Sequence, residues 1–419
     1  MTDKQPNLLV FSTLFPHPGQ PNAGLFIRER MFRVGKVLPL VVVAPVAWFP
    51  FQGIIRKWRP HFRPSAPRTE IQDGVEIYHP RFFSVPGIFK RLDGFFLALG
   101  ALPTLRRLRK IHSFNVIDAH FAYPDGYAAT LLGKWLDIPV TITLRGTEIR
   151  HSMDRTLRKP LITALKRAAK IFSVSDSLKQ HAIGLGIDPA KIQVVGNGVD
   201  TEKFHPLPKH EARQQLGLPP DAPVLISVGG LVERKGFHRV IECLPSLRLA
   251  FPGLQFLIIG GASAEGDWRA RLQELVACLS LQDTVRFLGA IPPDKLKLPL
   301  SASDVFVLAT SNEGWANVFL EAMACGLPVV TTRVGGNEEV VANPELGSLV
   351  PFGDQKALEQ AIAEALKKNW NREAIMAYAR ENSWDSRVQL LNDAFTQLTE
   401  GQVMLPEHSD PDDEDMEVV

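Results

Sequence analysis

The order of apolar runs along the chain is the feature that most constrains its fold. Short runs rich in β-branched residues alternate with helical patterns, first in one half of the chain and then again in the other. Those of the first half lie at 7–12, 39–45, 115–120, 139–144, 170–175 and 192–196. Those of the second half lie at 223–230, 254–261, 284–290, 304–310, 328–336 and 347–353. Strands separated by helices of about 10–15 residues predict parallel sheets with helices on both faces.

A proline- and charge-rich segment at 200–223, DTEKFHPLPKHEARQQLGLPPDAP, interrupts this alternation. The 419 residues also exceed the size of one ordinary core. We therefore expect two doubly wound, Rossmann-like α/β domains, at 1–200 and 201–383, with helices near 384–400 packing back on the first domain. Ligands of such sheets bind outside the carboxyl ends of the strands, so a cleft between two facing domains is the predicted site.

Charge is distributed unevenly between the two halves. Residues 1–205 contain 29 Lys and Arg against 15 Asp and Glu, a net charge of +14, and the remainder carries −12. This asymmetry indicates that one domain faces an anionic partner. Part of the acidic excess lies at the end of the chain, where we expect 404–419 to be a disordered, solvated tail.

Cysteine content and hydropathy indicate the cellular compartment in which the protein is expected. The three cysteines are far apart and odd in number, which argues against a disulfide framework or a zinc site and fits a reducing cytoplasm. No apolar run reaches the roughly 18 residues of a spanning helix. The first residues do not show the basic and then apolar pattern of a secretory signal, so we expect a cytoplasmic protein.

Two glutamates, Glu313 and Glu321, stand eight positions apart in SNEGWANVFLEAMACGLPVV. The first follows a predicted strand and the second lies about one turn inside a helix that begins near Asn317. Free N–H groups at that helix start suit a phosphate. The carboxylate of Glu321 can accept hydrogen bonds from the vicinal hydroxyls of a ribose. On spacing alone, a solvated glutamate on a helix surface remains an alternative.

The first strand of the second domain leads into SVGGLVERKGF, at 227–237. Backbone amides at Gly229 and Gly230, with Lys235 nearby, suit a diphosphate. The dinucleotide fingerprint G-x-G-x-x-G does not occur here or at LIIGGASAEG, which argues against an NAD-binding protein.

The stretch EGWANVFLEAMACGLPVVTTRVGGNEEVV resembles the signature of retaining glycosyltransferases of family four, which have the GT-B fold. The resemblance covers nearly the whole chain and is looser before residue 190. It implies two Rossmann-like domains facing a cleft, with the acceptor on the first and a nucleotide sugar on the second. By it, Glu313 contacts hydroxyls of the donor sugar, Glu321 the ribose, and the amides around Asn317 and Val318 the diphosphate. Gly314 belongs to the same donor-binding set.

In this family the loop after the first strand of the second domain usually reads V-G-R-L-x-x-x-K-G, and its Arg and Lys neutralise the leaving nucleotide. Lys235 matches the lysine, whereas Gly230 stands in the place of the arginine. Arg234 is the candidate that takes over its role. The segment VVGNGVDTEKF, at 194–204, resembles the family pattern at the exit of the first domain. We interpret Asn197 and Gly198 in it as a turn.

Three first-domain residues complete the implied site. His120 follows a strand and matches the second histidine of the family's H-x-H, which approaches the donor sugar; a satisfied structural histidine is the alternative. Arg145 stands where the family usually has histidine and could contact an anionic acceptor or a phosphate, or form a structural ion pair. Gly24 corresponds to a glycine of the acceptor loop, or is a turn glycine. Its segment, STLFPHPGQPNAGLFIRER, is similar to enzymes of bacterial cell-surface polysaccharide synthesis, including teichuronic acid enzymes.

Arginine, lysine and aromatic residues mix at 56–64 and 82–110. This composition favours docking on an anionic membrane surface, where lipid-linked acceptors lie, although packed helix is the alternative for 92–105. No nucleic-acid-binding module is evident, so we expect no nucleic-acid partner. The expected location is the inner face of the cytoplasmic membrane.

Together with these patterns, the resemblance implies a retaining, hexosyl-type transferase with His120, Glu313 and Lys235 as its catalytic residues. It would move a sugar from a UDP- or GDP-sugar donor to a hydroxyl of a glycan or lipid-linked acceptor. No D-x-D follows a strand, so we expect no metal and no cofactor apart from the donor substrate. A sugar-nucleotide epimerase on the same fold and a catalytically silent nucleotide-sugar-binding protein are the alternatives. The sequence does not define the base, the sugar, the acceptor or the oligomeric state.

Overall fold

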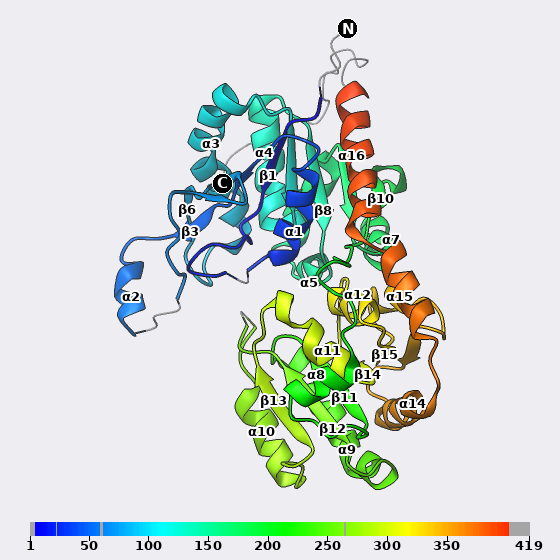
Figure 1. The fold of residues 1–419 in the computed structure, drawn as a ribbon. Helices are drawn as coiled ribbons and strands as arrows, with labels where there is room; N and C mark the ends of the chain where they lie inside the picture. The colour runs from blue at the N-terminus through cyan, green and yellow to red at the C-terminus, as the bar shows by residue number, and fades with distance from the viewer. Residues whose placement is uncertain (1–4, 22, 59–61, 264, 402–419) are drawn as a thin grey trace.

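The computed structural model describes residues 5–21, 23–58, 62–263 and 265–401, and it forms two α/β domains (Figure 1). The tail predicted at 404–419 lies outside the described residues. Within them, no helix combines the length and the apolarity that crossing a membrane requires.

The first domain is built on an eight-stranded sheet in the order β10-β9-β8-β7-β1-β2-β5-β4. All neighbours are parallel except β4 and β5, which are antiparallel. The strands are β1 (Leu8–Phe11), β2 (Leu40–Val43), β4 (Thr69–Gln72), β5 (Val75–Tyr78), β7 (Val116–His120), β8 (Val140–Leu144), β9 (Lys170–Ser173) and β10 (Ile192–Val194). A separate two-stranded ladder joins β3 (Val46–Trp48) to β6 (Arg81–Phe83).

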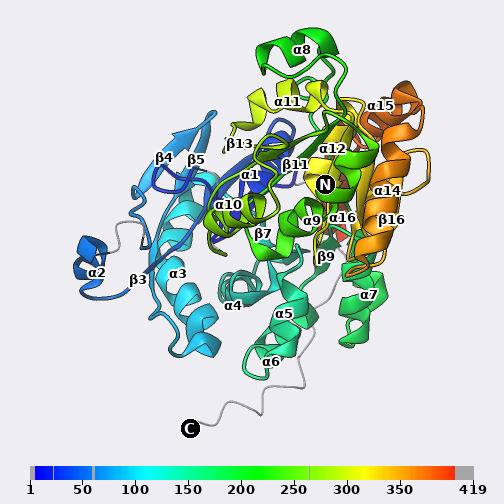
Figure 2. The ribbon, with the colours of Figure 1, turned by 90° about the horizontal axis from the view of Figure 1, so that it is seen from below.

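Helices cover both faces of this sheet, which is why its central strands are apolar throughout. One face packs against α3 (Asp93–His112), α4 (Tyr127–Leu136), α6 (Arg158–Arg167) and α7 (Asp176–Gly184). The opposite face packs against α1 (Leu25–Val34) and the last helix, α16 (Trp384–Gly401). Two further helices are α2 (Gln52–Trp58) and α5 (Thr147–Met153). The first stands away from the body of the domain (Figure 2), and the second packs beside α6 and α7.

The second domain has a six-stranded, all-parallel sheet in the order β13-β12-β11-β14-β15-β16. Its strands are β11 (Val224–Val228), β12 (Gln255–Ile259), β13 (Val285–Gly289), β14 (Val305–Leu308), β15 (Val329–Thr332) and β16 (Gly347–Val350). This is the doubly wound order, in which the direction of winding reverses between β11 and β14.

The helices of the second domain also form two layers. One layer contains α8 (Lys209–Gln215), α11 (Lys297–Ala302), α12 (Asn317–Ala324) and α15 (Arg372–Glu381), and the other α9 (Phe237–Ala250), α10 (Arg269–Cys278) and α14 (Gln355–Lys367). A short helix, α13 (Asn337–Val340), follows β15. Single helical turns are η1 (Lys90–Leu92), η2 (Ala122–Gly126), η3 (Pro189–Lys191), η4 (Glu233–Lys235) and η5 (Pro293–Lys295).

The chain crosses between the domains twice, and the two crossings are hydrogen-bonded to each other. The amide of Val199 donates to the carbonyl of Asn382 at 3.1 Å, and the amide of Trp384 donates to the carbonyl of Val199 at 3.2 Å. After the second crossing, α16 runs beside the first domain (Figure 1), where the Phe395 ring lies 5.5 Å from that of Phe172. The last helix therefore completes the core of the first domain.

The predicted fold class, two doubly wound α/β domains facing a cleft, is confirmed. Each predicted apolar run contains a strand of one of the two sheets. The structure adds the strands β3 to β6, which the sequence pattern did not predict. They are short and partly exposed, so they lack a continuous apolar run.

Candidate active site

A cavity of about 600 Å³ lies between the domains, at the carboxyl ends of β11 and β14. The winding of the second sheet reverses between these two strands, and this is where open α/β sheets bind ligands. Many of its lining residues come from the second domain: Gly229, Gly230, Arg234, Lys235, Glu265, Glu313, Gly314, Trp315, Asn317, Val318 and Glu321. The first domain contributes Phe26, Arg145, Gly146, Thr147, Arg150, Val174 and Asn197. Every second-domain residue predicted from the sequence to bind the donor therefore lines one cavity.

Glu313, which follows β14, is the centre of a charged cluster on the second-domain side. Its Oε1 accepts from the Lys235 Nζ at 2.6 Å and from the Arg234 Nη1 at 3.2 Å. The hydroxyl of Thr310 donates to the same oxygen at 3.1 Å. Only 8% of Glu313 is exposed, so these bonds compensate the burial of its charge. Two cations and one carboxylate are thus held together at the ends of β11 and β14.

Arg234 places a second cation beside Glu313, whereas Gly230 has no side chain to offer. The Arg234 guanidinium reaches the cavity from η4, while its Nε and Nη2 donate to Glu265 at 3.0 and 2.7 Å. A Cβ added at Gly230 would lie 3.2 Å from the Cβ of Ser263, which leaves little room for a side chain. The cavity thus holds a guanidinium from Arg234, the residue proposed from the sequence for this role, and no side chain at Gly230.

The amino end of α12 opens onto the same cavity. Ala316, Asn317 and Val318 line it, and no side chain caps the helix start, so its first N–H groups are available to a ligand. Within this helix, Glu321 is half-buried, and desolvation raises its pKa to about 7. The charge of Lys203 opposes this rise in the pKa of Glu321 and that of Glu29 adds to it.

A chain of hydrogen bonds joins the two domains across the cavity. Arg145 Nη1 donates to Asn197 Oδ1 at 3.0 Å, and Asn197 Nδ2 donates to Asn317 Oδ1 at 2.9 Å. The Arg145 guanidinium also lies 5.0 Å from the centre of the Phe26 ring. Asn197, interpreted from the sequence as a turn residue, thus has a connecting role. Its position just after β10, at the same edge of the sheet as the other strand ends, is the signal that could have identified it.

His120 is placed differently from the expectation. It is fully buried and does not line the cavity, so the direct approach to the donor sugar is not formed in this structure. Its Nδ1 lies 3.1 Å from Arg145 Nη2 and its Nε2 lies 3.5 Å from Asp118 Oδ2. Burial, then the charges of Arg145 and Arg30, hold the pKa of His120 well below its usual value. The neutral ring accepts a hydrogen bond from Arg145 and thereby positions a residue that does line the cavity.

Gly24 also lies outside the cavity lining. It precedes α1 with φ of +68°, and a Cβ there would collide with the carbonyl oxygen of Leu14. This glycine is needed for the close approach of two loop segments, which is the turn alternative considered for it. Glu265, by contrast, lines the cavity but was not predicted from the sequence. It follows β12, and a polar residue after a predicted strand could have identified it.

The described part of the chain contains no group of three or more His, Cys, Asp or Glu side chains arranged to hold a metal ion. The charges at the cavity are instead those of Lys235, Arg234 and their carboxylate partners.

Comparison with known proteins agrees with this architecture. Residues 208–382 match the family described as "Glycosyl transferases group 1", and residues 52–203 match "Glycosyltransferase Family 4". The putative teichuronic acid biosynthesis glycosyltransferase TuaC of Bacillus subtilis is 27% identical over 91% of both chains. A D-inositol 3-phosphate glycosyltransferase of Actinosynnema mirum is 35% identical over 79% of this chain and 84% of its own.

Among solved structures, HepE of Anabaena in complex with UDP superposes with a TM-score of 0.72 at 20% identity, covering 93% of this chain and all of that one. Two facing Rossmann-like domains with such a cavity define the GT-B class of glycosyltransferases. The chain belongs to glycosyltransferase family 4.

Proposed function

We propose that the protein is a retaining hexosyltransferase. The donor is a nucleoside diphosphate sugar, with UDP as the proposed nucleotide. The acceptor is a hydroxyl of a glycan or of a lipid-linked molecule, and the pathway is bacterial cell-surface polysaccharide synthesis. The observation that carries this proposal is the cluster of Lys235, Arg234 and Glu313 beside the uncapped start of α12. The UDP complexes of HepE and the teichuronic acid relative support the choice of donor and pathway.

The chemical demand is to stabilise a departing diphosphate while the anomeric carbon gains positive charge. Lys235, Arg234 and the first N–H groups of α12 supply positive potential where that charge develops. Glu313 orients the sugar hydroxyls, and Glu321 accepts hydrogen bonds from the ribose. The bond from the anomeric carbon to the phosphate oxygen breaks as the acceptor oxygen bonds on the same face. The acceptor proton passes to an oxygen of the departing phosphate.

The first domain offers the acceptor side. Its described surface exposes large apolar side chains near arginine and lysine: Trp48, Phe51, Ile54, Trp58, Phe83, Ile88, Phe89 and Phe95. A basic and aromatic surface of this kind suits the interface of an anionic membrane. We place the protein at the inner face of the cytoplasmic membrane, where a lipid-linked acceptor would meet the cleft.

Nucleotide release from UDP- and GDP-sugars, measured with and without acceptor, tests the proposal. Acceptor-dependent release and a product whose anomeric configuration matches the donor by NMR support it. An epimerised sugar without transfer, or donor binding without turnover, contradicts it. The same assay in excess EDTA tests the expectation that transfer needs no divalent metal.

A further inference from the structure

A second hollow, in the first domain and separate from the donor cavity, is lined by four arginines. It has a volume of about 490 Å³ and lies between the β3–β6 ladder, α3 and the segment that precedes β4. The arginines come from four segments: Arg56 from α2, Arg68 from before β4, Arg81 from β6 and Arg107 from α3. None of its lining residues lines the donor cavity.

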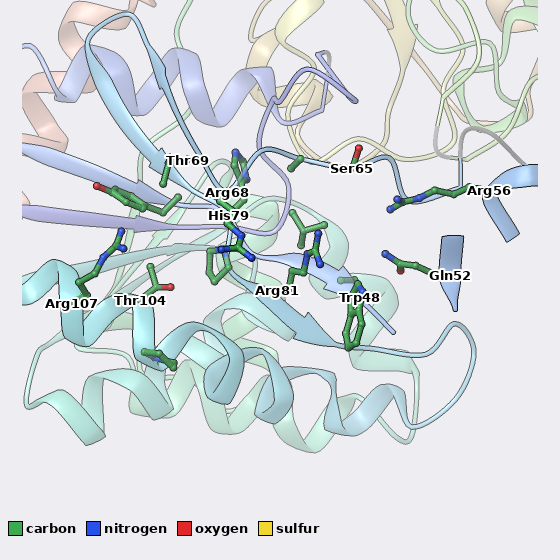
Figure 3. Close-up of a pocket in the computed structure, with 16 residues that line it drawn as sticks. Trp48, Gln52, Arg56, Ser65, Arg68, Thr69, His79, Arg81, Thr104 and Arg107 are labelled. Carbon is green, nitrogen blue, oxygen red and sulfur yellow. The ribbon is translucent and has the colours of Figure 1, made fainter. Parts of the chain in front are cut away.

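Figure 3 shows that these side chains are spread along the hollow. Arg107 lies toward one end and Arg56 toward the other, with Arg68, His79 and Arg81 between them. Positive charge therefore extends along a groove rather than meeting at one point, which suits an elongated anionic group or two linked phosphates.

The positive charge of the hollow is not neutralised from within the protein. No Asp or Glu occurs among its lining residues, and within the described ranges no carboxylate forms an ion pair with any of the four arginines. The nearby Glu70 is engaged with His79, whose Nε2 lies 2.9 Å from its Oε1. Arg56 donates to the carbonyl of Arg63 at 2.6 Å and Arg107 lies 5.5 Å from the Tyr78 ring centre. Arg68 and Arg81 are exposed, and their charge is available to a ligand.

Exposed aromatic side chains occur in the wall of the hollow and in the chain segment that continues from it. Trp48 lines it and is 36% exposed, and the chain continues directly into α2, where Phe51 and Trp58 are 81% and 86% exposed. Single exposed apolar residues are ordinary, but a cluster beside an arginine groove marks an interaction surface. Arginine next to exposed aromatic groups is the chemistry that fits a phosphate joined to an apolar chain.

We infer that this arginine hollow binds the phosphate or diphosphate group of a lipid. The inference rests on the proposed function in its choice of a lipid-borne source, and adds a second phosphate site to the donor site. A membrane phosphate bound in this hollow would hold the first domain against the membrane. The hollow would thereby determine how the cleft is oriented relative to the membrane surface.

The test uses the full chain with saturating UDP, so that the donor site is occupied, and inorganic pyrophosphate as the titrated probe. We expect the double variant Arg68→Gln/Arg81→Gln to bind pyrophosphate at least about tenfold more weakly than the wild type, because charge-assisted hydrogen bonds are lost. The matched control, Arg155→Gln/Arg167→Gln, removes the same charge from exposed positions that line neither the hollow nor the segments at 56–64 and 82–110, and should bind as the wild type does.

A lack of pyrophosphate binding by the UDP-loaded wild type, or an equal loss in both double variants, would overturn the site. Sedimentation with phosphatidylcholine vesicles that contain phosphatidylglycerol then distinguishes the source. A larger loss for the hollow variant than for the control supports a lipid phosphate. Equal vesicle binding by the two, with pyrophosphate binding still impaired, overturns the lipid source and leaves a soluble phosphate as the ligand. UDP affinity, measured on all variants, reports separately on the proposed function.

Discussion

The ammonium group of Lys235 lies 2.6 Å from the carboxylate of Glu313, and this pair joins the two loops that follow β11 and β14. The lysine is thereby held at the mouth of the cavity, aimed at the place where a diphosphate would lie. A donor phosphate can replace Glu313 as the hydrogen-bond acceptor of the lysine. The carboxylate then remains available to accept from sugar hydroxyls. Under the proposed function, the lysine would serve the diphosphate and the glutamate the sugar of one donor substrate.

Lys235→Ala should lower kcat for nucleotide release by about 10²- to 10³-fold, the range seen when one transition-state donor is removed. Lys166→Ala, an exposed lysine of α6, is the control and should leave kcat unchanged. Steady-state kinetics with a UDP-sugar and acceptor measure both. An unaltered kcat in Lys235→Ala would exclude the lysine from leaving-group stabilisation.

Donor affinity should rise with pH through about 7. Below that pKa the half-buried Glu321 carboxyl is protonated, and above it the carboxylate can accept from both ribose hydroxyls. Titration calorimetry of UDP between pH 5.5 and 8.5 measures this effect. Glu321→Gln should bind UDP about tenfold more weakly at pH 8 and should lose this pH dependence. The same slope in wild type and variant would assign the titration to another group.

The buried His120 should act through Arg145. His120→Ala removes the acceptor of the Arg145 Nη2 hydrogen bond, so kcat should fall by about tenfold or more while UDP affinity changes little. His120→Gln, whose amide oxygen can accept the same bond, should restore most of kcat. If the glutamine variant is as impaired as alanine, the orienting role proposed for His120 is wrong.

Gly314→Ala tests the contact between the domains. The added Cβ would lie 2.6 Å from the carbonyl oxygen of Arg145, and Gly146 is adjacent. We expect the domains to be held apart, kcat/KM to fall at least tenfold, and stability to fall by about 1–3 kcal/mol. Gly184→Ala, where a Cβ would meet no atom within 4 Å, is the control. Small-angle scattering and thermal unfolding measure the two effects, and a fully active Gly314→Ala would show that this contact does not matter.

Part of this molecule could be predicted from its sequence for a simple reason. Strands buried on both faces of a parallel sheet are continuous apolar runs, and polar residues that follow them gather at one edge. Glu313 and Lys235 were identifiable in this way. The half-exposed strands β3 to β6 carry no such run, so the arginine hollow that they border was not identifiable as a pocket.

The remaining site features depend on tertiary contacts. The burial of His120 beneath Arg145 comes from packing between strands, which spacing along the chain does not encode. The bridge from Asn197 to Asn317 joins residues 120 positions apart. The contact of Arg234 with Glu313 depends on the loop geometry, because the turn of η4 brings the guanidinium to within 3.2 Å of that carboxylate.

The return of α16 to the first domain also determines the order in which the molecule can be completed during synthesis. The ribosome makes the first domain before the second, yet Phe395 and its neighbours on α16 belong to the first domain's core. That core cannot be completed until α16 has left the ribosome. The second domain, finished earlier, can therefore fold ahead of the domain that precedes it.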